Sequence, residues 1–227
     1  MKLRLLKVNK MFCNLNELRN CIKNENLEKV NLCIESLAKR WEYIEYHFRE
    51  YERMTNHINN SNNAIIFIFN YDKSNLINKL AIEANIIAFM QNLHTIQDIL
   101  GHLVYYSLNL KIESERNITL WKVKNELKKL TNSENLINLI DDFNTHSNSK
   151  FLNAIVNISK HRYIIFPRFY VEMSKNWYGY KFLPFEYESE KYEEKRIHEF
   201  ILEEHERQLK LDIEIKNELI RYLKTYK

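Results

Sequence analysis

Apolar residues recur at helical spacing along most of the chain, which predicts a predominantly α-helical protein. Between residues 27 and 58 they follow one another at alternating intervals of four and three, as in a long helix with one buried face. This stripe consists of Val30, Ile34, Leu37, Trp41, Ile44, Phe48, Tyr51 and Ile58. We interpret it as a helix of a bundle rather than an isolated coiled coil, because other segments offer matching apolar faces.

Several further segments have the length and periodicity of helices. They are residues 76–108, 118–130, 134–143, 151–161 and 197–226. A shorter helix is predicted at residues 15–22, and Ser133 is a candidate N-cap for the helix that follows it. The apolar run at residues 64–69 could be a strand or the start of a buried segment. Its periodicity does not distinguish the two, because the run is too short.

The region between residues 163 and 187 differs in composition from the predicted helices, and it predicts a small β-hairpin. Two aromatic and β-branched stretches flank a turn-like segment at residues 174–179. Pro167 and Pro184 favour edge or irregular strands. We interpret the charged residues 188–196 as a solvated helix entry. The predicted fold class is therefore all-α: an up-and-down bundle of about five to seven helices with a hairpin insert near 163–187.

The composition agrees with one helical domain. Gly and Pro occur only twice each, too few for an all-β or α/β chain with many tight turns. Because nothing in the sequence marks a linker or an internal repeat, we expect a single domain over residues 1–227, with residues 1–26 as an N-terminal extension. The formal net charge of +4 permits weak attraction to phosphate but is far from a dedicated nucleic-acid surface.

The sequence predicts a cytoplasmic protein with no membrane partner. Cys13, Cys21 and Cys33 are an odd number without a CxxC pair, and reduced cysteines are typical of cytosolic proteins. The first residues contain no apolar run long enough for a signal peptide. A stretch of about 18 apolar residues, which a membrane-spanning helix needs, does not occur in the sequence.

Two of the predicted helices carry a polar stripe with a spacing of four residues. One stripe comprises Asn153, Asn157 and His161, and the other comprises His94, Asp98 and His102. Buried polar groups need partners, so we expect the two stripes to face each other. We expect Asp98 to be buried and to pair with His161 or His102, because an unpaired buried carboxylate costs several kcal/mol.

Three interpretations of these stripes stay open. Histidine and aspartate are common metal ligands, although the repeated Glu-x-x-His of di-metal bundles does not occur in these helices. A satisfied polar core would need no function. A functional cleft would be built on His161 with Asn157, Lys160 and Arg162, and it is the interpretation that we favour; we expect no metal and no other cofactor. The supporting residues would be Asp98, His102, His94 and Asn153.

The helical topology, the Asp-bearing polar face and the helix ending in NISKHR at residues 157–162 resemble the HEPN superfamily (higher eukaryotes and prokaryotes nucleotide-binding). This resemblance implies a homodimeric helical bundle and, in many members, a metal-independent endoribonuclease of toxin–antitoxin or phage-defence systems. The resemblance implies that His161 acts as the general acid or base and that Asn157 takes the polar position of the motif. It also implies that Lys160 or Arg162 supplies the positive charge that binds phosphate. The motif's arginine falls on Val156, so the alternative is a non-catalytic module that binds a nucleotide or a protein partner such as a cognate antitoxin.

Other residues have simpler interpretations. Trp177, at the hairpin tip beside Tyr178, is a packing anchor or a platform for stacking on a base or a partner. His198 and His205 are interpreted as solvent-facing. A literal copy of the HEPN motif runs from Arg40 to His47 in the first long helix, and we interpret it as surface charge.

Overall fold

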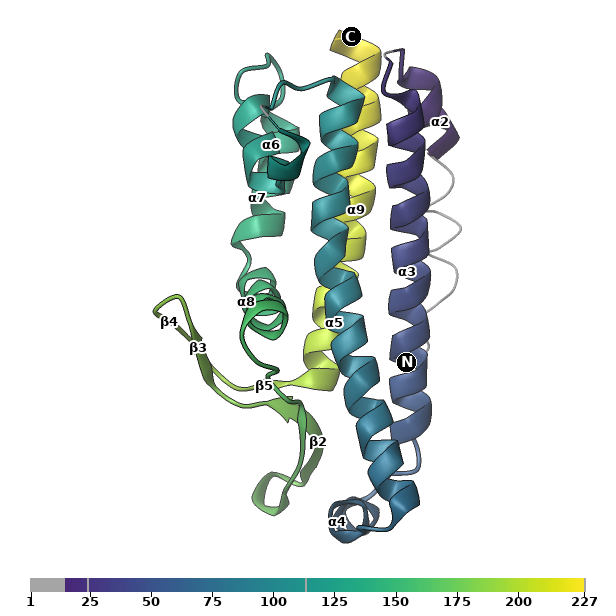
Figure 1. Cartoon of the computed structure of the whole chain (residues 1–227), viewed down its shortest axis with the longest axis vertical. Helices are drawn as coiled ribbons and strands as arrows, with labels where there is room; N and C mark the ends of the chain where they lie inside the picture. The colour runs from purple at the N-terminus through teal and green to yellow at the C-terminus, as the bar shows by residue number, and fades with distance from the viewer. Residues whose placement is uncertain (1–14, 24, 113, 227) are drawn as a thin grey trace. The chain divides into compact units, whose positions relative to one another are not determined.

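The computed structural model describes residues 15–23, 25–112 and 114–226, which are mostly helical with a small antiparallel β region (Figure 1). The helices are α2 (Leu15–Cys21), α3 (Leu27–Thr55), α4 (Ser61–Phe69), α5 (Lys73–Leu108), η1 (Glu115–Asn117), α6 (Leu120–Leu127), α7 (Glu134–Thr145), α8 (Ser147–His161), η2 (Met173–Lys175) and α9 (Ile197–Tyr226). The strands are β1 (Arg168–Glu172), β2 (Trp177–Phe182), β3 (Phe185–Tyr187), β4 (Glu190–Tyr192) and β5 (Lys195–Arg196). The mostly helical fold with a hairpin is confirmed. Cys13 and residues 1–14 of the predicted N-terminal extension lie outside the described residues.

The chain divides into two compact units. The first unit comprises Met1–Lys39, Thr95–His146 and Glu206–Lys227, and the second comprises Arg40–His94 and Ser147–His205. Three of the unit boundaries fall within α3, α5 and α9, and the fourth falls between α7 and α8. Neither unit is a continuous stretch of chain, so each core is assembled from segments far apart in the sequence. None of the described helices has the length and apolar character needed to cross a membrane.

The predicted apolar stripe of α3 is buried along its whole length. Its buried residues are Val30, Ile34, Leu37, Trp41, Ile44, Phe48 and Tyr51. Ile58 is buried as well, but it follows the end of α3 at Thr55. The long helices at the positions of α5 and α9 are confirmed as well. A 3.6-residue period places such residues on one face, and burial of that face stabilises the helix more than its intrinsic propensity does.

In the first unit, α6 and α7 pack against each other (Figure 1). Gly101 of α5 allows a close approach to the start of α6, because a Cβ at this glycine would lie 3.2 Å from the backbone nitrogen of Leu120. Ser133 occupies the predicted N-cap position of α7, but its hydroxyl donates instead to the carbonyl oxygens of Leu127 (2.6 Å) and Leu130 (3.0 Å). It therefore ties the end of α6 to the start of α7.

In the second unit, residues 64–69 belong to a helix, which decides the alternative that the sequence left open. Asn60 caps α4, because its side-chain oxygen accepts from the backbone nitrogen of Asn63 at 2.9 Å. The buried ring of Phe67 then lies 4.9 Å from the ring of Phe169 in β1. Helix α4 thus packs on the β1–β2 hairpin.

The predicted hairpin is confirmed, with different bounds. Strands β1 and β2 pair antiparallel from Arg168 opposite Lys181 to Glu172 opposite Trp177. Strand β1 begins only at Arg168, and Asn176 makes the tight turn with φ 46°. The predicted turn at residues 174–179 is too long, because Trp177 already belongs to β2.

The interpretation of residues 188–196 as a solvated helix entry is wrong. Strands β3 and β4 form a second antiparallel hairpin, and β5 pairs with β2. Glu188 and Ser189, with φ of 50° and 68°, make the turn between β3 and β4. Two consecutive positive φ angles suit a hairpin turn, but the usual Asn-Gly or Asp-Gly signal is absent from this sequence position.

An aromatic cluster joins α8 to these strands and to α9. Phe151 is its centre, with ring centroids 5.1 Å from Phe200, 5.4 Å from Phe185, 6.0 Å from Tyr192 and 6.1 Å from Phe182. Such tilted and edge-to-face pairs add stability beyond the area they bury. The cluster fixes α8 in the second unit and thereby positions the polar residues at its C-terminal end.

Candidate functional site

The last turn of α8 carries the residues predicted for catalysis. Lys160, His161 and Arg162 are exposed, and Asn157 is half-buried. The helix ends here because the backbone nitrogens of residues 162 and 163 both donate to the carbonyl oxygen of Ile158, at 2.8 and 3.1 Å. Cations at a helix C-terminus are stabilised by the helix dipole, so this end concentrates positive charge at the surface.

Tyr187 of β3 holds two of these side chains. The guanidinium carbon of Arg162 lies 5.2 Å from the Tyr187 ring centroid, within cation–π range. The side chain of Glu188 raises the pKa of the Tyr187 hydroxyl, whereas the charge of Arg162 and a hydrogen bond from Asn157 act in the opposite direction. Arg162 and Asn157 therefore share one partner, and both lie beside the β3–β4 hairpin.

The end of α8 and the chain that follows it form a surface segment in which cations flank apolar side chains. We call residues 160–168 the basic–aromatic segment. Its exposed apolar side chains are Tyr163, Ile164 and Phe166, and its exposed cationic side chains include Lys160, Arg162 and Arg168. Exposed rings can stack on bases, and cations can contact phosphates. The segment thus has the chemistry of a single-strand nucleic-acid surface.

His94 belongs to the same unit but cannot act as an acid near neutrality. Only 6% of His94 is exposed, and burial, followed by the positive charge of Lys160, lowers its pKa to about 4. The influence of Lys160 places the His94 side of α5 within electrostatic range of the end of α8. The imidazole is therefore neutral at pH 7. Asn153, the other supporting residue in this unit, is half-buried on α8.

Asp98 is exposed, so the expectation of a buried carboxylate is wrong. Its neighbours Ile96 and Leu100 are fully buried and occupy the core face of α5, which leaves Asp98 on another side of the helix. His102 donates through Nδ1 to the backbone carbonyl oxygen of Asp98 at 2.8 Å. Asp98 and His102 belong to the first unit and His161 to the second. That the two polar stripes face each other stays a prediction.

The interpretation of Arg40 and His47 as surface charge is wrong. Both are half-buried and contact amides of α5 within the second unit. Arg40 Nη1 donates to Asn92 Oδ1 at 2.7 Å, and His47 Nδ1 lies 2.9 Å from Asn85 Oδ1. The heptad spacing of residues 40 and 47 puts them on the same side of α3, which is why both meet α5.

The two histidines of α9 have different environments. His198 is exposed, as predicted, but His205 is buried, so its solvent-facing interpretation is wrong. The ring of His205 lies 5.4 Å from Trp41 and 6.4 Å from Phe89. Next to it, Glu204 is fully buried and accepts a hydrogen bond from the hydroxyl of Ser149 in α8. Hydrophobic periodicity does not reveal these two buried polar residues.

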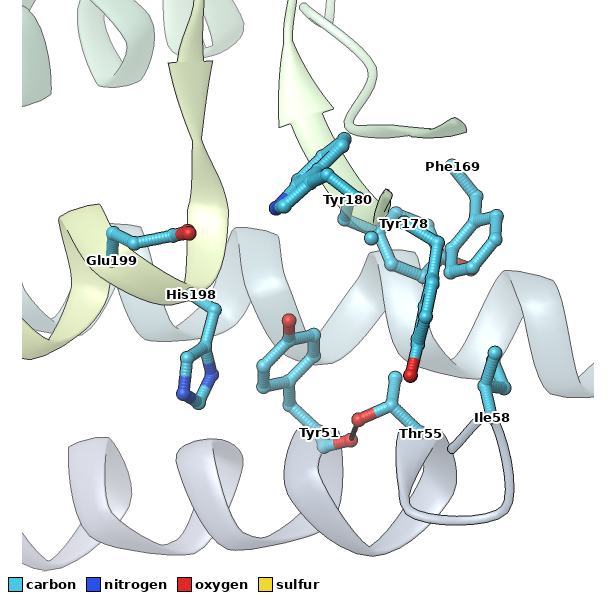
Figure 2. Close-up of a pocket in the computed structure, with 10 residues that line it drawn as sticks. Tyr51, Thr55, Ile58, Phe169, Tyr178, Tyr180, His198 and Glu199 are labelled. Carbon is cyan, nitrogen blue, oxygen red and sulfur yellow. Dashed lines mark hydrogen bonds between the residues drawn. The ribbon is translucent and has the colours of Figure 1, made fainter. Parts of the chain in front are cut away.

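A pocket of about 200 Å³ opens between α3, the β1–β2 hairpin and the start of α9, all within the second unit (Figure 2). Helix α3 contributes Tyr51 and Thr55, strand β2 contributes Trp177 and Tyr178, and α9 contributes Glu199 near its start. The aromatic cluster at residues 177–180 is the sequence signal for this pocket, but only the fold brings α3 and α9 to it.

Among the described residues, no group of three or more His, Cys, Asp or Glu side chains is arranged to hold a metal ion. Comparisons with protein-family models, with curated proteins and with solved structures give no match to this chain. The resemblance to the HEPN superfamily therefore stays a prediction from the sequence.

Proposed function

We propose that this chain is an HEPN-like, RNA-directed protein that contacts single-stranded RNA through its basic–aromatic segment. One observation carries the proposal: within residues 160–168, exposed cations at both ends flank exposed aromatic rings. Aromatic stacking contributes about 1–3 kcal/mol per base and tolerates many sequences. Phosphate contacts add a term that weakens as salt rises. Because Arg162 already lies against Tyr187, less side-chain freedom is lost when it meets a phosphate.

In its catalytic form the protein is a metal-independent endoribonuclease. His161 acts as the general acid or base at the ribose hydroxyl. Asn157, with Lys160 or Arg162, stabilises the negative charge that develops on the phosphate. The support is that Lys160, His161 and Arg162 are exposed together at the end of α8, with the half-buried Asn157 about one turn before them.

Replacing Arg162 or Tyr163 by alanine is expected to weaken binding of a fluorescently labelled single-stranded RNA by about tenfold each, as loss of one phosphate or stacking contact implies. The measurement is fluorescence anisotropy at several salt concentrations, and Arg162→Ala should lower the salt dependence by about one ion. Lys191→Ala and Tyr71→Ala are matched controls, because both residues are exposed in the same unit but lie outside the segment. Equal losses in the controls would contradict a specific surface.

The catalytic form is tested by cleavage of cellular RNA in the presence of EDTA. We expect cleavage by the wild type and loss of cleavage in His161→Ala. His57→Ala is the control, because His57 is exposed in the same unit and belongs to no proposed site. Equal cleavage by the wild type and His161→Ala, or none by either, would rule out this form and leave RNA binding to be judged separately.

A second candidate is a non-catalytic binding module of the same fold. Val156, at the position of the motif's arginine, is only 1% exposed and belongs to the core. A guanidinium there would be a buried charge, which is costly without a partner. This candidate predicts RNA that is bound and not cut, or a protein partner such as an antitoxin that co-purifies with the chain. The homodimer implied by the HEPN resemblance is tested by sedimentation of the purified protein.

A further inference from the structure

The pocket of Figure 2 has walls made mainly of aromatic rings. They are Tyr51 of α3, Phe169 of β1, and Trp177, Tyr178 and Tyr180 of β2. The rings of Phe169 and Tyr180 support each other edge to face, with centroids 5.2 Å apart. Walls of this kind favour a flat ligand whose faces can stack.

The Trp177 wall is fixed before any ligand arrives. Gly179 has φ +154°, and a Cβ at this position would lie 3.2 Å from Trp177 Cζ2, so the indole packs directly on the glycine backbone. The guanidinium carbon of Arg196 lies 4.5 Å from the Trp177 ring centroid. A platform held in this way loses little side-chain freedom when a ligand stacks on it.

Polar groups also line the pocket. Figure 2 shows the hydroxyl of Tyr51 directed into the space between Glu199 on one side and Tyr178 on the other. Burial, followed by the negative charge of Glu199, raises the pKa of Tyr51, so this hydroxyl is neutral and can donate. The Glu199 carboxylate can accept. The enclosed hydroxyl of Tyr180, another lining residue, has no hydrogen-bond partner among the described residues.

Size and polarity together restrict the ligand. The pocket is smaller than the ~300–1,000 Å³ of sites for drug-sized molecules, so it fits one ring system. An alkylated ammonium group also suits aromatic cages, but it offers no acceptor to the Tyr51 hydroxyl, and the cationic Arg196 stands against the Trp177 wall. A purely apolar ring would leave the Tyr51 hydroxyl without an acceptor. A nucleobase supplies both a stacking face and a polar edge.

We infer that this pocket binds a single unpaired nucleobase, stacked on its aromatic walls with the polar edge toward Tyr51 and Glu199. The carboxylate accepts and does not donate, so it favours a base with adjacent N–H donors, as on the edge of guanine. The inference rests on the proposed function only for the source of the base, which is either single-stranded RNA or a free nucleotide.

The pocket and the basic–aromatic segment are joined by one step along the chain. Arg168 ends the segment, and the next residue, Phe169, is part of the pocket wall. If the base comes from an RNA strand, we expect that strand to contact both the segment and the pocket, whereas a free nucleotide would use the pocket alone.

The test uses the full chain with guanosine and adenosine monophosphates and with short single-stranded RNAs containing one or no guanine. Binding is read by calorimetry and by quenching of the Trp177 fluorescence, which Trp177→Phe should remove. We expect Tyr178→Ala to weaken binding about tenfold, as loss of one stacking wall implies. We expect Glu199→Gln to reduce the preference for guanine over adenine. The matched controls are Tyr71→Ala and Glu203→Gln, both at exposed positions outside the pocket, with folding of every variant checked by circular dichroism.

Each result bears on one of the two proposals. Binding of the free nucleotide supports the pocket and identifies a nucleotide as the source of the base. Binding of only the guanine-containing RNA supports the pocket and identifies RNA as the source. If Tyr178→Ala and Glu199→Gln bind like wild type, or if neither probe binds, the pocket is not a base site. RNA binding that depends on Arg162 and Tyr163 but not on Tyr178 leaves the proposed function intact and removes the pocket. Binding of the nucleotide without binding of RNA supports the pocket and contradicts the proposed function.

Discussion

Replacing Phe151 by alanine is expected to lower the free energy of unfolding by about 3–5 kcal/mol, the usual cost of removing a fully buried aromatic ring. Phe151 is 1% exposed. Its ring contacts four other rings from β2, β3, β4 and α9, and the Lys195 ammonium lies 5.3 Å from its centroid. Truncation leaves a cavity in the cluster that joins α8 to the strands, so the end of α8 would also lose its fixed position.

The measurement is equilibrium urea unfolding followed by circular dichroism. Phe69→Ala is the matched control, because Phe69 is 69% exposed on α4 of the same unit and should change stability by less than about 1 kcal/mol. A similar small change for Phe151→Ala would show that the cluster does not stabilise the second unit.

Local periodicity was enough to predict the long helices. In α3, the buried stripe from Val30 to Tyr51 needs no knowledge of its partners, because a 3.6-residue period puts those residues on one face. The short elements were harder. Residues 64–69 have no decisive period, and the cap at Asn60 settles their helix. The β3–β4 turn uses Glu188 and Ser189 at positive φ, a conformation that these residue types rarely adopt.

In the candidate site, too, some contacts follow from the local sequence and others depend on the fold. Lys160, His161 and Arg162 meet because they are neighbours at a helix end, which the sequence shows directly. The contact of Arg162 with Tyr187 joins residues 25 positions apart, so no local pattern predicts it. The error at Asp98 has a physical cause: an apolar helix can still leave one side exposed, and composition does not say which side.

The residues of the pocket show most clearly what sequence periodicity does not predict. The sequence marked Trp177 and Tyr178 as rings that could stack, because they are adjacent aromatics in a predicted hairpin. Tyr51 belonged, by its period, to the core face of α3, and its role in the pocket depends on where α3 meets β2 and α9. A period identifies the buried face of a helix, but it does not distinguish a packed interior from a cavity wall.

Lowering the pH from 7 to 5 is expected to remove about 2 kcal/mol of stability through His94 alone. Burial, followed by the charge of Lys160, lowers the pKa of His94 to about 4, against about 6.5 for an unfolded histidine. Below pH 6.5 the unfolded chain therefore binds a proton that the folded chain does not. The stability is complete above pH 6.5 and is lost progressively as the pH falls toward 4.

Substitution His94→Gln isolates this effect, because glutamine keeps a polar side chain that does not titrate. Urea unfolding at pH 7 and pH 5 should show a fall in stability that is smaller by about 2 kcal/mol in His94→Gln than in the wild type. His57→Gln is the control, since it makes the same change of side chain at an exposed histidine of the same unit. An identical fall in His94→Gln and the wild type would show that His94 becomes protonated in the folded protein. The buried face of α5 beside Lys160 would then tolerate a charge, and His94 would become available as an acid near the end of α8.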